Sequence, residues 1–170
     1  MGKNQTLLKS QLEAAILLLK KLSEELSPQY IGLITTSGHT LTSLAATGFN
    51  GNSDSLASLA SGSFAATREM ARLMDDFDFT VMLHEGNNVN IYIVQVTDGV
   101  LLVICFGKKT QIGKVRLLAG RMTGALAEAL GSAPPELTRQ RLAQADVYAE
   151  GVGRVIDELF DVEGEQDGPY

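Results

Sequence analysis

The chain has 170 residues, which suits one compact domain with appendages and a sizeable buried core. Its net charge of -6 and pI near 4.9 argue against nucleic acid and anionic membranes as partners, because both attract clustered Lys and Arg. The single cysteine cannot form an internal disulfide, and the longest N-terminal apolar run is far shorter than the roughly 20 residues that span a bilayer. These features predict a soluble cytoplasmic protein without membrane insertion.

The first half of the chain predicts two helices around a pair of short strands. Apolar residues at helical spacing indicate an amphipathic helix over Thr6–Leu26. The runs "YIGLIT" and "TLTSLAA" flank the turn "TSGH", in which Gly38 can take a positive φ, and predict a β-hairpin. After a loop rich in turn formers, Ser53 or Asp54 is expected to cap a second helix over about 55–74.

Three strands and two further helices are expected in the second half. The strands Phe79–Glu85, Val89–Val96 and Val100–Phe106 are joined by turns too short for anything but an antiparallel meander. A third helix begins near Ile112 and ends at "GSAPP". The order of elements predicts an α+β fold, a five-stranded antiparallel sheet covered by helices. The expected organisation is a domain over 1–131, a Pro-containing linker over 132–136, an amphipathic C-terminal helix over 137–160 and an acidic, disordered tail over 161–170.

The stretch "CFGKKTQIGKV" raises the possibility of a phosphate-binding loop. That motif requires four residues between its glycines and a hydroxyl after the lysine. Here five residues separate Gly107 from Gly113, and Val115 stands where the magnesium-binding hydroxyl belongs. The preceding strand also closes an antiparallel meander, whereas a P-loop lies in a parallel βαβ unit. The stretch is therefore interpreted as a lysine-bearing turn between a strand and a helix.

No other pattern of residues indicates chemistry. His39 and His84 lack ligand spacing to a second His or Cys, so no metal site is expected. Cys105 lies in the apolar run "VLLVICF" and is expected to be a buried thiol. The serines of "SDSLASLASGSF" have no assignable base, and "LMDDFD" is a helix end without a second acidic cluster. We expect no catalytic residue and no cofactor.

The surface of the second helix is unusually rich in small residues. If the apolar residues Leu59, Ala66, Met70 and Leu73 face the sheet, a helical wheel at about 100° per residue fixes the orientation of the other residues. It then places one group along a flank (Ala57, Ala60, Phe64 and Ala71) and another outward (Ser58, Ser61, Ala65, Arg68, Glu69 and Arg72). Small residues let another backbone approach closely, and arginines offer planar donors. The alternative is an ordinary solvated helix face.

The strand Phe79–Glu85 is expected to form an open edge of the sheet. It begins the meander directly after a helix, so it pairs within the chain on one side only, and neither proline nor lysine blunts its other side. Pairing with a second copy by two-fold symmetry would cover the edge and bring two second helices together. The sequence thus predicts a homodimer whose edge contains Phe79, Val81, Leu83 and Glu85.

The order of elements and three stretches resemble the roadblock/dynein light chain superfamily, and within it the gliding-motility regulators of the MglB type. The stretches are "LASLASGSFAATREMARLM", "LHEGNNVNIYI" and "VLLVICFGKKTQIGKVRL". Glu85 replaces the glutamine of the family's His-Gln-Gly turn. The resemblance covers roughly 30–130 and extends weakly to "YAEGVGRVIDELF". It implies a profilin-like sheet with helices on both faces.

The resemblance also implies a function, as regulator of a small Ras-like GTPase (MglA-like). In the family, a homodimer engages one GTPase across its paired second helices and promotes GTP hydrolysis without donating an arginine finger. The positions that match this interface are Ala57, Ser61, Phe64, Ala65, Arg68 and Arg72. A second contact of the C-terminal helix would involve Tyr148, Val152 and Val155, unless these residues pack on their own domain.

Two alternatives remain beside this interpretation. One is a roadblock scaffold that recruits a GTPase or another protein without changing its turnover. The other is an enzyme or small-ligand sensor on a profilin-like sheet, which needs a polar pocket that the sequence does not display.

Overall fold

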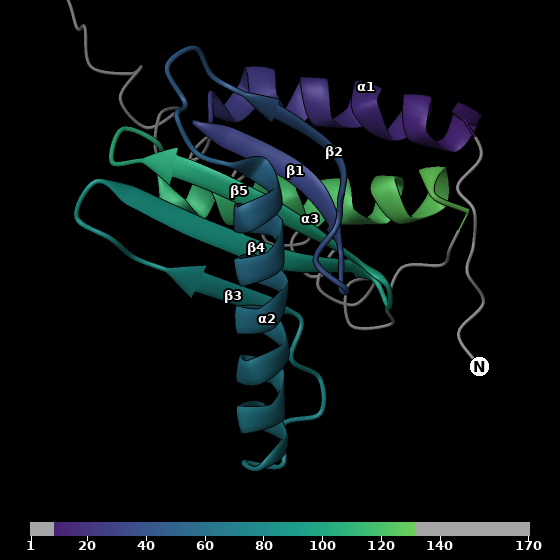
Figure 1. The fold of residues 1–170 in the computed structure, drawn as a ribbon, viewed down its shortest axis with the longest axis vertical. Helices are drawn as coiled ribbons and strands as arrows, with labels where there is room; N and C mark the ends of the chain where they lie inside the picture. Colours follow the sequence, from purple (N-terminus) through teal and green to yellow (C-terminus); the bar gives the residue numbers. More distant parts are fainter. Residues whose placement is uncertain (1–8, 132–170) are drawn as a thin grey trace, which may run out of the picture.

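A computed structural model describes residues 9–131 of the chain (Figure 1). Five strands form one antiparallel sheet in the order β2-β1-β5-β4-β3, so β2 and β3 are its two edges. The elements are α1 (Lys9–Leu26), β1 (Tyr30–Thr35), β2 (Thr40–Ala45), α2 (Ser53–Arg72), β3 (Val81–His84), β4 (Val89–Thr97), β5 (Val100–Gly107) and α3 (Ile112–Ala129). None of these helices is long and apolar enough to cross a bilayer.

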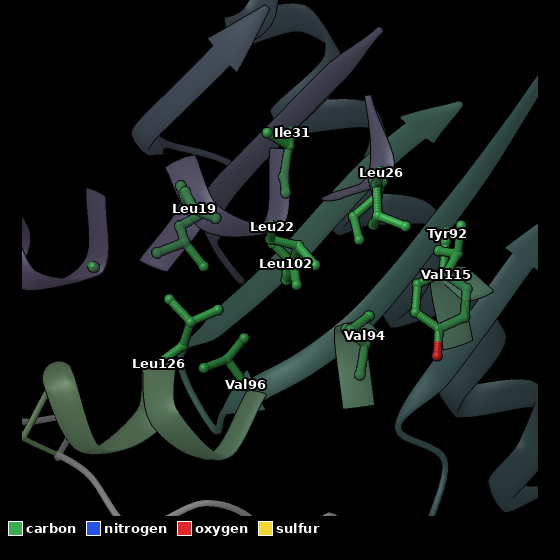
Figure 2. Close-up of a cluster of buried hydrophobic side chains, with 14 of the residues drawn as sticks. Leu19, Leu22, Leu26, Ile31, Tyr92, Val94, Val96, Leu102, Val115 and Leu126 are labelled. Atoms are coloured by element: carbon green, nitrogen blue, oxygen red, sulfur yellow. The ribbon is translucent and has the colours of Figure 1, made fainter. Parts of the chain in front are cut away.

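Helices cover both faces of the sheet and bury a separate core on each. On one face α1 and α3 pack beside each other, and Figure 2 shows their side chains meeting those of β1, β4 and β5. On the other face α2 packs over a second cluster that includes Tyr30, Phe64 and Cys105. Because both faces of β5 are covered, its sequence is a continuous apolar run rather than an alternating one. The predicted α+β architecture is confirmed.

The turn of the β1–β2 hairpin packs against the first half of α2. Gly38 takes a φ of 89°, as predicted, and a Cβ at this position would lie 3.1 Å from the Cα of Ser58. The hydroxyl of Ser58 donates to the carbonyl of Gly38 at 3.4 Å. A side chain at position 38 would therefore push the first half of α2 away from the sheet.

The stretch "CFGKKTQIGKV" joins β5 to α3 as the predicted turn. The Thr110 hydroxyl donates to the carbonyl of Leu26 at 3.3 Å, and Lys114 Nζ donates to the carbonyl of Glu25 at 2.6 Å. These bonds satisfy carbonyls at the C-terminal end of α1. Lys114 thus caps the C-terminal end of α1.

Several predicted boundaries differ from the structure. The predicted caps of α2 were wrong: Asn52 is the cap, and its Oδ1 accepts from the amides of Asp54 and Ser55 at 3.0 and 2.9 Å. The helix consequently begins at Ser53 and ends at Arg72, where 55–74 was predicted. β3 is shorter than predicted. The predicted linker, C-terminal helix and tail lie outside the described residues, as do Tyr148, Val152 and Val155.

Candidate interaction surface

The first half of α2 lies on the sheet, and the second half continues past it. Figure 1 shows the helix crossing the sheet and projecting beyond β3. Its buried residues all lie in the first half: Ala57, Ala60, Ser61 and Phe64. The small side chains let the helix axis approach the strands closely. The Phe64 ring packs against that of Phe79 with a centroid separation of 5.3 Å, which fixes the helix where it passes over β3.

The predicted orientation of α2 was wrong. Leu59, Met70 and Leu73 were expected to face the sheet, yet they are 72%, 58% and 85% exposed, and Ala66 is exposed as well. The prediction took this apolar arc as the one that faces the sheet. The structure instead places the other apolar arc, with Ala57, Ala60 and Phe64, against the sheet.

This orientation divides the six predicted GTPase contacts. Ala57, Ser61 and Phe64 are buried between α2 and the sheet, so in this monomer they are not accessible to a partner protein. Ala65 and Arg72 are exposed, as predicted. Arg68 is half-buried, and its Nε atom is buried with no hydrogen-bond partner among the described residues.

The projecting half of α2 exposes a concentration of large apolar side chains. No residue of the helix beyond Phe64 is buried. The apolar surface of Met70 and Leu73 continues into the following loop with Met74, 82% exposed, and Phe77, 70% exposed. Soluble monomers rarely expose large apolar groups so close together. This end of α2 is therefore a candidate surface for contact with another protein chain.

Strand β3 provides a second open feature beside this helix. It is hydrogen-bonded to β4 alone, as predicted for an edge strand. The carbonyl of Thr80 accepts from the amide of Gln95 at 2.8 Å. Since hydrogen-bonded and non-hydrogen-bonded pairs alternate in an antiparallel ladder, Val81 and Leu83 direct their amides and carbonyls toward the open side. Phe79 lies just before the strand and Glu85 just after it.

Neither a reactive thiol nor a metal-binding cluster is present among the described residues. Cys105 is buried in the core beneath α2, and burial raises the pKa of its thiol to about 11, so little thiolate forms near neutral pH. No group of three His, Cys, Asp or Glu side chains among residues 9–131 could hold a metal ion. The Nε2 atom of His84 lies 3.5 Å from the hydroxyl of Ser63, a contact that fixes α2 relative to β3.

Comparison with known proteins identifies the family of this chain. The Roadblock/LC7 domain matches residues 15–106, and the chain belongs to this family. No protein of curated function matches the sequence.

The chain is also similar to solved structures of MglB. The gliding protein MglB of Thermus thermophilus shares 28% identity at a TM-score of 0.69, with 77% of this chain and 98% of that chain covered. A structure described as MglB with a tetrameric arrangement shares 27% identity at a TM-score of 0.70, over the same shares. Myxococcus xanthus MglB shares 26% identity at a TM-score of 0.65, with 75% and 91% covered. The predicted resemblance is confirmed.

Proposed function

From this membership of the Roadblock/LC7 family, we propose that the protein is a cytoplasmic homodimer that regulates a small Ras-like GTPase of the MglA type, in motility or cell polarity. It binds the GTPase and stimulates GTP hydrolysis without an active site of its own. The observation that supports this function most directly is the similarity to the gliding protein MglB over nearly the whole length of that chain. The homodimer is supported by the open edge of β3.

The GTPase contacts the outer flank of α2, which consists of Ser58, Ala65, Glu69 and Arg72. All four residues are exposed and, at about 100° per residue, lie on one arc of the helix. Ser58 and Ala65 are small and let the partner backbone approach closely. Arg72 Nη1 lies 2.7 Å from Glu69 Oε1, so its guanidinium is held along the helix. Ala57, Ser61 and Phe64 take part indirectly, because they hold α2 on the sheet.

The arginines of α2 suit a binding surface better than the role of an arginine finger. A finger must extend from its own chain into the active site of the partner. Arg72 is paired with Glu69, and Arg68 is half-buried against its own domain. The protein therefore acts by binding one conformation of the GTPase more tightly than the other, which shifts the conformational equilibrium of the GTPase.

The test is the rate of phosphate release by an MglA-type GTPase with and without this protein. We expect the wild type to raise the rate and Ala65→Arg to abolish both binding and stimulation, because a long charged side chain separates the two surfaces. Ala46→Arg, at an exposed alanine after β2, is the matched control and should behave as the wild type. Thermal unfolding of both variants checks that the fold is retained.

Two results would change the proposal. Binding without any change in phosphate release would make the protein a scaffold that recruits the GTPase. Undiminished binding by Ala65→Arg would place the GTPase contact away from the outer flank of α2.

A further inference from the structure

The β5–α3 turn and the start of α3 concentrate positive charge in a chain that is acidic as a whole. Between Gly99 and Ala127 the sequence has five basic residues and no acidic one, although the net charge of the chain is -6. Four of the five lie in the turn and the first turns of α3. All four are exposed, and together they form the basic surface: Lys108, Lys109, Lys114 and Arg116. A surface with this charge attracts an acidic partner.

The described part of the chain does not neutralise the basic surface. The first turn of α3 has no acidic residue. Lys114 Nζ donates to the backbone carbonyl of Glu25, at the end of α1, and not to a carboxylate. The ion pairs of residues 9–131 lie elsewhere, on α1 and on α2, and include no residue of the basic surface. The lysines and the arginine of this surface are therefore available to carboxylates from outside residues 9–131.

The chain itself has an acidic stretch beyond the described residues. After Arg154 the sequence contains no basic residue and six acidic ones: Asp157, Glu158, Asp161, Glu163, Glu165 and Asp167. The last four belong to the acidic tail over 161–170. A segment on the same chain has an effective concentration on the order of millimolar, so weak contacts suffice to hold it. A separate acidic protein would need far higher affinity to occupy the same surface.

The length of the chain after α3 allows this tail to return to the basic surface. The 18 residues of α3 span about 27 Å, so the basic surface lies roughly that far from Gly131, the last described residue. Residues 137–160, for which the sequence predicts a helix, would span about 36 Å. The Pro-containing linker over 132–136 provides a place for the chain to reverse its direction. A helix that runs back along α3 would therefore bring residue 161 to the β5–α3 turn.

We propose that the acidic tail, residues 161–170, docks on the basic surface of its own chain. This contact goes beyond the proposed function, since it requires neither a GTPase nor a second copy. Exposed ion pairs are individually weak, so several form together, and salt weakens the contact by screening them. While the tail is docked, residues 137–160 lie beside α3, and a partner that binds them has to release the tail.

The rate of disulfide formation within the full chain measures this contact. Gln111 is exposed beside the basic surface, and Gly164 lies within the tail. Under mild oxidation we expect Gln111→Cys/Gly164→Cys to form a disulfide within one chain, separated from covalent dimers by its mobility on a non-reducing gel. Cys105 is buried and does not compete. A covalent dimer as the main product would overturn the contact within one chain, because it would place the tail of a second copy on this surface.

Charge reversal in this cysteine background distinguishes docking from random encounters of a tethered tail. Adding Lys108→Glu and Lys109→Glu should slow disulfide formation at least about fivefold, because attraction becomes repulsion. Adding Lys20→Glu and Lys21→Glu is the matched control: it makes the same change of net charge at an exposed lysine pair on α1 and should leave the rate unchanged. Equal rates in the two charge-reversed variants would overturn the proposal.

Exchanging the charges gives an independent test. Glu163→Lys and Glu165→Lys, added to the variant with Lys108→Glu and Lys109→Glu, should restore the rate, since the exchanged groups attract again. Thermal unfolding shows whether each variant keeps the fold. A rate that stays low in the exchanged variant, with the fold retained, would refute the pairing of the tail with this surface. None of these measurements contains a GTPase, so their outcome is independent of the regulatory function.

Discussion

The two halves of α2 differ in what determines their sequence. The first half, up to Phe64, buries small residues and one aromatic ring against its own sheet. The second half has no sheet beneath it, and its large apolar residues are exposed. Under the proposed function, one continuous helix packs within the domain through its first half and offers its second half to another chain. The comparison shows that the larger apolar residues of a surface helix need not be the ones that its own domain buries.

The largest expected difference between the two halves is in the stability that the domain loses when a residue of each half is replaced by alanine. Phe64→Ala removes a fully enclosed ring and should lower the free energy of unfolding by about 3–5 kcal/mol. Met70→Ala truncates an exposed side chain of the second half and should change the stability of the monomer by no more than about 0.5 kcal/mol. Urea denaturation, at a protein concentration too low for the dimer to form, measures the free energy of unfolding of both variants.

The same pair of variants should show the reverse order in self-association. Met70→Ala should weaken the dimer and reduce the dependence of the melting temperature on protein concentration. Equal losses of monomer stability in the two variants would mean that the second half is also part of the domain core, contrary to the comparison.

A smaller loss of stability is expected from replacing Gly38, which lies against the first half of α2. Gly38 and Gly48 both take positive φ, so alanine costs either position about 1–2 kcal/mol of backbone strain. At Gly38 the added Cβ also meets Ser58 and Ser61 of α2, whereas at Gly48 it meets nothing within 4 Å. Gly38→Ala should therefore cost about 1–3 kcal/mol more than Gly48→Ala. Equal unfolding free energies for the two variants would show that the hairpin does not support α2.

The smallest expected effect concerns the cap of α2. Asn52→Ala removes the side chain that accepts from two backbone amides and should cost about 1 kcal/mol. Ser55→Ala alters an exposed residue of the first turn that contributes only its backbone to the cap, and serves as the control. A loss in helix content confined to Asn52→Ala would confirm the assignment of the cap.

The sequence predicted the sheet and its edge well, because these follow from local patterns. Short turns containing glycine predicted the antiparallel meander of β3, β4 and β5. Because β3 opens this meander directly after α2, it was predicted to pair with β4 alone and to form an edge of the sheet. The orientation of α2 was not predicted, since its wheel has two apolar arcs: Leu59 and Met70 on one, Ala57 and Phe64 on the other. Hydrophobicity alone cannot tell which arc its own domain buries.

The interaction surface was predicted in part for the same reason. Ala65 and Arg72 are exposed where the sequence placed them, while Ser61 and Phe64 were assigned to the partner and belong to the core. Rotating the wheel so that the small arc faces the sheet accounts for all four positions.

The central claim is that the second half of α2 and the edge of β3 are completed by a second copy of the chain. Sedimentation equilibrium of the full-length protein at micromolar concentration tests it most directly. The account predicts a mass of about twice the 18.2 kDa of one chain, returning to a single chain in Met70→Asp. A wild-type protein that sediments as one 18.2 kDa subunit at these concentrations would contradict it.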